Sequence, residues 1–219
     1  MDIPNEMIIK ITTDSRILVQ EMTGVALSYK EIEPDAFYQC IRHSLRRSMF
    51  SSGLLPKGCF QFSMDDQGTR YVAMEFPDFK ADISYEKTLY EQFPLPKMVF
   101  GFSVSKDGRI SNVRLGITEN KKITLNSKMY LYPFSNVSDF NVCLGANRMP
   151  QVKCLTQLNG IPYYVLSMPN NDDRFSSDRN KLELSSRALF EHLKDKDTAY
   201  YYNDVLIESK RTIKDFIND

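Results

Sequence analysis

The residues best suited to chemistry lie close together in the second half of the chain. Cys143 is flanked by a valine and a leucine and lies seven residues after Asn136. A thiolate is a strong nucleophile, and a side-chain amide can donate a hydrogen bond to a developing oxyanion. A cysteine between two aliphatic residues is usually a small buried hydrophobe. The Ser- and Asn-rich residues before it and Gly145 after it favour a loop that turns at the thiol, and we take Cys143 and Asn136 as candidate catalytic residues.

Proline-containing segments lie on both sides of this stretch. Residues 93–100 read Phe-Pro-Leu-Pro-Lys-Met-Val-Phe, and Met149-Pro150 follows Cys143. Proline fixes its own φ and removes an N–H donor, so residues 93–96 are expected to lead into a strand from an extended, edge-like segment. Taken alone, such a segment is most often only the start of a strand.

Other reactive residues leave alternatives open. The chain has only two histidines, His43 and His192, and neither is near Cys143 in sequence. A cysteine hydrolase needs an imidazole to generate its thiolate, and folding would have to supply one. Cys154 is the rival thiol that we would test.

An acidic pair follows the candidate thiol by about thirty residues. Asp172 and Asp173 lie in a polar, turn-rich segment, where a carboxylate can orient or deprotonate an incoming amine. Charge in a loop is most often only solvated, and we favour that interpretation. Arg42, Arg46 and Arg47 on a predicted helix are either a solvated face or a docking surface for an acidic partner.

Composition limits the classes of function. The 219 residues carry 28 Lys and Arg against 28 Asp and Glu, so no global field favours nucleic acid or an anionic membrane. The first residues lack the basic start and apolar run of a secretory signal, and no apolar stretch approaches the roughly 18 to 20 residues of a membrane span. Four scattered cysteines do not form a disulfide framework. We expect a cytoplasmic protein with free thiols and no paired-cysteine metal site.

The elements that must position these residues follow from periodicity. Residues 7–32 alternate apolar and polar in three short runs, which predicts a small antiparallel meander. Pro34 and Asp35 start a helix with an apolar residue every fourth position from Phe37. We therefore divide the chain into an N-terminal β appendage, 1–33, and a main domain, 34–219.

The main domain is predicted to be α+β. Strand-like runs lie at 59–62, 71–76 and 98–102, and the Lys106-Asp107-Gly108 turn predicts a hairpin with 109–115. Residues 79–90 fit either a strand or a helical turn. Apolar residues at helical spacing predict helices over 182–193 and 205–217. Strands precede helices in the chain, which is typical of an α+β fold.

The motifs together resemble a known superfamily. Ubiquitin-conjugating enzymes carry Phe-x-Pro-Pro-x-x-x-Phe, then His-Pro-Asn-Ile, then a loop ending in Ile-Cys-Leu, then a proline. This chain has matching residues at 93–100, at 134–137 as Phe-Ser-Asn-Val, at 142–144 as Val-Cys-Leu, and at Pro150. The resemblance runs from about Pro34 to Pro150 and points to bacterial family D of the superfamily, the family of PRTRC system protein B.

The resemblance implies a fold and a reaction. The expected fold is a helix, an antiparallel meander sheet, a catalytic loop and carboxy-terminal helices. Cys143 would accept a ubiquitin-like protein as a thioester from a ThiF-like activating enzyme that consumes ATP, and would pass it to an acceptor amine. Asn136 would support the oxyanion, and a JAB-type isopeptidase would belong to the same pathway.

The sequence departs from the eukaryotic pattern at three points. Phe134 and Ser135 stand where His and Pro would be, Phe100 and Asn136 are 36 positions apart, and the spacing from Asn136 to Cys143 is one residue shorter. We expect an inserted hairpin before the catalytic loop. The alternatives are a catalytically inactive docking module of the same fold and a cysteine hydrolase.

Overall fold

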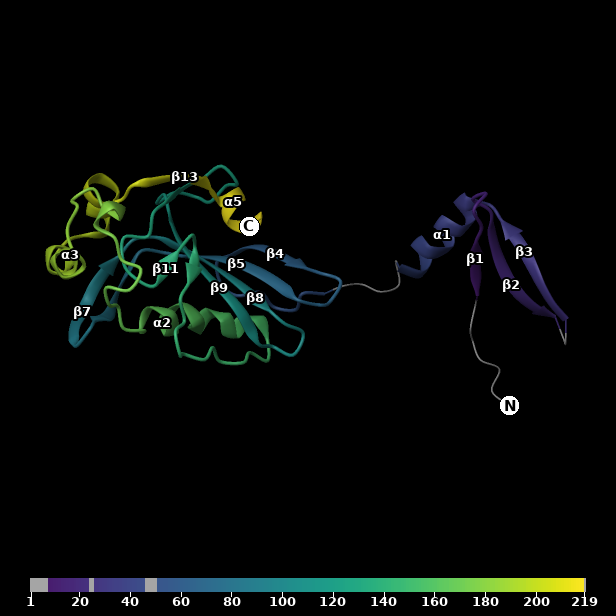
Figure 1. Ribbon diagram of the computed structural model, residues 1–219, viewed down its shortest axis with the longest axis horizontal. Helices are drawn as coiled ribbons and strands as arrows, with labels where there is room; N and C mark the ends of the chain where they lie inside the picture. Colours follow the sequence, from purple (N-terminus) through teal and green to yellow (C-terminus); the bar gives the residue numbers. More distant parts are fainter. Residues whose placement is uncertain (1–7, 24–25, 46–50, 219) are drawn as a thin grey trace. The chain divides into compact units, whose positions relative to one another are not determined.

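The computed structural model describes residues 8–23, 26–45 and 51–218 (Figure 1). By their contacts the residues form two compact units, a smaller unit of residues 1–52 and a larger unit of residues 53–219. Among the described residues, none of the helices combines the length and the apolar character that crossing a bilayer requires.

The smaller unit consists of a three-stranded antiparallel sheet and one helix. The strands are β1 (Ile9–Ile11), β2 (Ile17–Thr23) and β3 (Ala26–Ile32), in that order across the sheet, and the helix is α1 (Pro34–Leu45). The meander and the helix start at Pro34 are as predicted. The contacts group α1 with this sheet, whereas the sequence analysis assigned the helix to the main domain. Ile17 is the one buried hydrophobic residue among the side chains described in this unit.

The larger unit is built on an eight-stranded sheet in which every pairing is antiparallel. Its first four strands pair in chain order, as a meander. The predicted strand runs and the predicted hairpin at 106–108 are confirmed, and Gly108 has the positive φ, +88°, that the turn requires. The strands are β4 (Cys59–Met64), β5 (Arg70–Phe76), β8 (Met98–Val104), β9 (Ile110–Thr118), β10 (Lys128–Tyr130), β11 (Val137–Ser138), β12 (Asn141–Val142) and β13 (Glu208–Thr212).

A separate hairpin lies between β5 and β8 in the chain. It consists of β6 (Phe79–Tyr85) and β7 (Thr88–Leu95), so the ambiguous residues 79–90 form strand on both sides of a two-residue turn. Pro94 lies inside β7 opposite Lys80. The proline-containing segment is therefore more than the start of a strand, because it ends one hairpin strand and connects it to β8.

Short helices cover both faces of the main sheet (Figure 1). The elements are η1 (Leu155–Gly160), α2 (Ile161–Leu166), η2 (Ser177–Arg179), α3 (Ser186–Leu193), α4 (Thr198–Tyr200), η3 (Tyr201–Val205) and α5 (Ile213–Asn218). The prediction of one helix over 205–217 was wrong, because β13 interrupts it by pairing with β10. Helix α3 also begins later than predicted, at Ser186.

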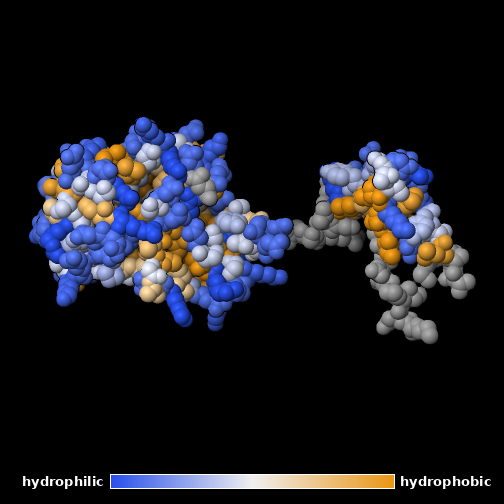
Figure 2. Space-filling model, viewed as in Figure 1, coloured by the Kyte–Doolittle hydropathy of each residue, from blue (hydrophilic) through white to orange (hydrophobic). Residues whose placement is uncertain are grey.

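Strand alternation divides the core between the two faces. Side chains such as Phe100 and Phe102 of β8 pack with α2 and α3 in the main cluster. Val99 of β8 points the other way, where it packs with Ile213 and Phe216 around α5. On the face seen in Figure 2, most of the surface of the larger unit is hydrophilic around an apolar area near its centre. The α+β prediction is confirmed by this mixed, antiparallel architecture.

Candidate functional site

A short hairpin, whose strands β11 and β12 have two residues each, brings Asn136 and Cys143 together. Asn136 directly precedes β11 and Cys143 directly follows β12, and the two strands pair antiparallel. The backbone N–H of Cys143 donates to the carbonyl oxygen of Asn136 at 2.6 Å. The hairpin is attached to the main sheet by the pairing of β12 with β9. The sequence-predicted pair is therefore joined through its backbone at the edge of the sheet.

Left-handed backbone conformations shape this turn. Asn136 has φ +65°, and the two residues at the tip of the hairpin, Asp139 and Phe140, have φ +49° and +64°. Asparagine tolerates the left-handed region better than most residues. The Nδ2 atom of Asn136 donates to the carbonyl oxygen of Pro169 at 3.1 Å. One of the two amide N–H groups is thus committed to the protein, and one is left for another acceptor.

The thiol of Cys143 is half-buried, and among the described residues its Sγ atom has no hydrogen-bond partner. The backbone turns after it as predicted, because Gly145 has φ +54°. Further on, the N–H of Val152 donates to the carbonyl of Gly108 at 2.9 Å. Residues 143–152 therefore form a loop that is attached to the sheet at both ends.

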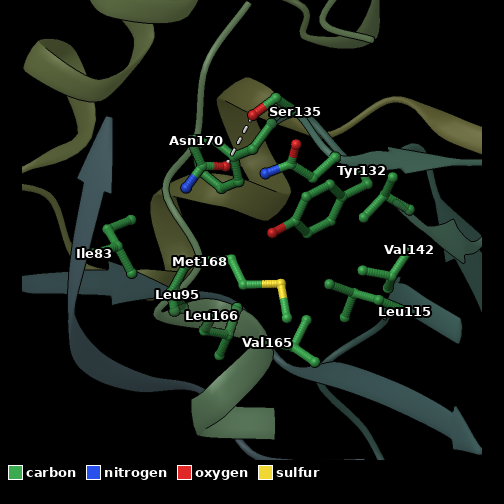
Figure 3. A pocket seen from close by; sticks show the side chains of 13 residues that line it. Ile83, Leu95, Leu115, Tyr132, Ser135, Val142, Val165, Leu166, Met168 and Asn170 are labelled. Carbon is green, nitrogen blue, oxygen red and sulfur yellow. Dashed lines mark hydrogen bonds between the residues drawn. The ribbon is translucent and has the colours of Figure 1, made fainter. Parts of the chain in front are cut away.

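A small cavity of about 20 Å³ lies behind the hairpin (Figure 3). That volume is about the size of one water molecule, so the cavity has no room for an organic cofactor. Apolar side chains form most of its wall, and Ser135, Asn136 and Asn170 contribute polar groups. Tyr132 also lines it, and burial raises the pKa of the Tyr132 hydroxyl.

The two residues that precede Asn136 are buried. Phe134 is 2% exposed and packs against Phe190 and Tyr132. Ser135 is 1% exposed, and its hydroxyl donates to Asn170 Oδ1 at 3.1 Å. Phe134 and Ser135 thus pack in the interior beside the turn, and Asn136 lies on its more exposed side.

The acidic pair follows directly on the segment that contacts this turn. Residues 169–171 contact Ser135 and Asn136 through hydrogen bonds, and Asp172 and Asp173 come next, both exposed. Asp172 accepts a hydrogen bond from the Tyr85 hydroxyl at 2.8 Å. Burial, and then the bond to Asp172, raise the pKa of Tyr85. Asp173 is bonded only to Asn171 in the described part of the chain.

Two of the remaining predicted residues, His192 and Cys154, are hydrogen-bonded to neighbouring side chains. His192 Nε2 is 2.8 Å from the Tyr200 hydroxyl, and the side chain of His43 lies outside the described part of the chain, as do Arg46 and Arg47. Arg42 is exposed. Cys154 is exposed, with its Sγ 3.1 Å from Thr156 Oγ1.

Two expectations about packing had different outcomes. The sequence favours core packing over a partner contact for the run Tyr200 to Tyr202, and Tyr201 is buried, with its hydroxyl donating to the Pro94 carbonyl at 2.8 Å. Cys40 lies next to the apolar stripe of its helix in sequence, which predicts burial, and this prediction was wrong because Cys40 is exposed on α1. In the described residues, no group of three or more His, Cys, Asp or Glu side chains is placed to hold a metal ion.

Sequence reasoning missed the role of Asn170. The Pro-Asn-Asn-Asp-Asp run indicated only a polar loop, yet Asn170 is 8% exposed and is bonded to two separate segments. The Pro-Asn sequence does indicate that the asparagine side chain makes hydrogen bonds with backbone groups, because asparagine often does so in turns. The pattern does not identify the distant partners.

No protein-family model, curated protein or solved structure matches the chain.

Proposed function

We propose that this chain is a ubiquitin-conjugating-enzyme-like transferase that carries a ubiquitin-like protein on Cys143 as a thioester. The observation that carries the proposal is the hairpin that joins Asn136 to Cys143. It leaves the half-buried thiol at the start of a loop and joins the backbone of Cys143 to that of a residue with an amide side chain. The proposal combines this geometry with the sequence resemblance to bacterial family D, including PRTRC system protein B.

The order of elements supports the same proposal. A four-stranded meander is followed by the loop with the thiol, and then by η1 and α2, which pack on one face of the sheet. That order is the one expected for the family from residue 53 onward. Between this meander and the turn at Asn136 the chain adds only the short strand β10, which pairs with the end of β9, so the inserted hairpin expected before the catalytic loop is reduced to this one strand.

The chemistry needs no cofactor on this chain. The Cys143 thiolate attacks the thioester carbonyl of the modifier bound to a ThiF-like activating enzyme, a new C–S bond forms, and the enzyme's thiolate leaves. An acceptor amine then attacks the Cys143 thioester, loses a proton to a base, and expels the Cys143 thiolate. The free N–H of Asn136 is a donor for the tetrahedral oxyanion. ATP is consumed by the activating enzyme, and a JAB-type isopeptidase would reverse the modification.

Incubation with an activating enzyme, ATP and a ubiquitin-like protein tests the proposal. We expect an adduct on the wild-type chain that a thiol reductant removes. The Cys143→Ser variant should form an oxygen ester that resists the reductant. Cys154→Ser is the matched control, because Cys154 is the exposed thiol nearest in sequence to Cys143, and it should behave as the wild type. A reductant-sensitive adduct that is kept in Cys143→Ser and lost in Cys154→Ser would contradict the assignment of Cys143 as the nucleophile.

The second candidate is a catalytically inactive docking module of the same pathway. The observation in its favour is the commitment of one Asn136 N–H to Pro169 together with a hydrophobic residue, Phe134, at the usual His position. A chain that binds the ubiquitin-like protein but forms no adduct with a competent activating enzyme would support this candidate. A cysteine hydrolase would instead release a product from an amide or ester substrate without ATP.

A further inference from the structure

Asn170 is a buried polar residue held by a hairpin that is remote in sequence. Its N–H donates to the Ser84 carbonyl at 2.8 Å, and its carbonyl accepts from the N–H of Glu86 at 2.7 Å. Residue 170 thus forms a parallel bridge beside Tyr85 at the end of β6. The side-chain Nδ2 also donates to the Ser84 carbonyl, at 3.2 Å. The position of Asn170 is therefore set by the β6–β7 hairpin.

The other end of the Asn170 side chain faces the turn that carries Asn136. The Ser135 hydroxyl donates to Asn170 Oδ1 at 3.1 Å, the bond drawn in Figure 3, and accepts from the N–H of Asn171 at 3.2 Å. Ser135 is 1% exposed and Asn170 is 8% exposed. Loss of either partner would leave a buried polar group unsatisfied, because solvent has little access to replace it.

Two further bonds continue from this turn to the thiol residue. Asn136 donates from its side chain to Pro169, one residue before Asn170, at 3.1 Å. Its carbonyl accepts the N–H of Cys143 at 2.6 Å. Hydrogen bonds therefore connect β6 to Asn170 and Asn170 to Ser135, the peptide bond connects Ser135 to Asn136, and a further hydrogen bond connects Asn136 to the backbone of Cys143.

We propose that Asn170 is a positioning residue that sets the conformation of the Asn136 turn and, through it, of Cys143. It acts by joining the turn to the β6–β7 hairpin, and it does not touch the reacting atoms. The effect of Asn170 on transfer of the modifier rests on the proposed function. The coupling between Asn170 and the Cys143 backbone is independent of any activity.

Amide hydrogen exchange of Cys143 measures this coupling directly. In Asn170→Ala we expect the Cys143 N–H to exchange about 5-fold faster. The local opening that exposes this N–H then has one hydrogen bond fewer to break, the bond between Ser135 and Asn170. The Phe100 amide, in the centre of the core strand β8, should be unchanged. Asn180→Ala is the matched control, because Asn180 is also buried and its side chain bonds only to Ser177 and Leu184. In that control, Cys143 exchange should remain as in the wild type.

Ser135→Ala removes the same bond from the other side and tests the proposal if Asn170→Ala does not fold. Combining the two substitutions should accelerate Cys143 exchange by clearly less than the product of the two single effects, because both variants lose the same Ser135–Asn170 bond. Unchanged Cys143 exchange in both single variants would overturn the proposal. Equal acceleration in Asn180→Ala, or additive effects in the double variant, would show general loosening instead and would also overturn it.

Discharge of the Cys143 thioester to free lysine supplies the functional measurement. We expect Asn170→Ala to lower the single-turnover rate at saturating lysine while leaving the lysine concentration for half-maximal rate unchanged. A wild-type chain that forms no thioester would refute the proposed function, and the exchange measurements would still decide the role of Asn170. Normal transfer with unchanged exchange in the variants would refute the positioning role alone.

Discussion

At the scale of single residues, Asn136 has two separable features, its left-handed backbone and its amide. The φ of +65° places the carbonyl to accept the Cys143 N–H, and the side chain extends to Pro169. Glycine adopts a positive φ without steric cost. A glycine at this position would therefore keep the turn and remove only the amide.

We accordingly expect Asn136→Gly to accept the modifier as a thioester but to pass it to lysine about 10² to 10³ times more slowly, the usual cost of one lost oxyanion donor. Single-turnover discharge, followed on a gel, measures the rate. Gln92→Gly is the control, because Gln92 also has a positive φ, +51°, and an exposed side chain, and it lies in β7 beside the irregular pairing with β6. A discharge rate in Asn136→Gly equal to that of the wild type would leave Asn136 with a purely structural role.

The sequence located the candidate thiol but not its supports. Cys143 and Asn136 are close in the chain, and the turn-forming residues between them made their proximity predictable. Asn170 and Ser84 are 86 positions apart, so their pairing depends on the tertiary placement of β6. Single-sequence patterns carry no information on such contacts.

At the scale of elements, the loop after Cys143 is fixed by a close backbone approach at Gly108. A Cβ atom at Gly108 would lie 2.0 Å from the Val152 carbonyl oxygen, and the residue has φ +88°. Only glycine fits there, and the resulting Val152 to Gly108 hydrogen bond attaches the far end of the loop to the β8–β9 turn.

Gly108→Ala should therefore lower the free energy of unfolding by about 2 to 4 kcal/mol, from left-handed strain plus overpacking against backbone. Gly145→Ala is matched for positive φ, but nothing lies within 4 Å of its Cβ position, and about 1 kcal/mol is expected from strain alone. Urea unfolding of the two variants measures the difference. Equal costs would mean that Val152 does not approach Gly108 as described.

Elements with clear periodicity were predicted well, and those decided by pairing were not. The alternation in β5 and β8 and the Lys-Asp-Gly turn gave correct strands and a correct hairpin. Residues 205–217 contain apolar residues at helical spacing, yet Glu208–Thr212 forms β13 because β10 offers an unpaired edge. Local helical preference is weak enough for such pairing to reverse it.

At the scale of the whole molecule, the core of the larger unit contains a set of tyrosines that favour the neutral phenol. Tyr90 is 5% exposed and donates to Glu191 Oε1 at 2.7 Å, which connects the β6–β7 hairpin to α3. Burial first, and then Glu191, raise the pKa of Tyr90 to about 12 from an ordinary value of 10.0. A raised pKa means that the stabilisation is complete below pH 10 and is lost as the pH rises through about 12.

We expect wild type to be more stable than Tyr90→Phe at neutral pH by about 0.5 to 1.5 kcal/mol, the net value of one hydrogen bond. That difference should shrink steadily between pH 10 and pH 12 as the wild-type phenol ionises. Urea midpoints of both chains across this range measure it. A difference that stays constant up to pH 12 would contradict the coupling of Tyr90 ionisation to folding.

The two units differ in how well they bury apolar surface. The larger unit has two buried clusters that cover both faces of its sheet. In the smaller unit, Ile11 is 70% exposed and Tyr38 is 62% exposed. A unit of 52 residues has little capacity for a core, and the sequence, which shows apolar alternation in both units alike, did not reveal this difference.

The backbone handedness of the thiol hairpin also restricts how sequences with this site can diverge. Asn136, Asp139 and Gly145 all have positive φ within ten positions, and few amino acids occupy such conformations readily. Distant relatives that retain the geometry should therefore keep Asn, Asp or Gly at these spacings around the cysteine even where the rest of the chain has changed beyond detection.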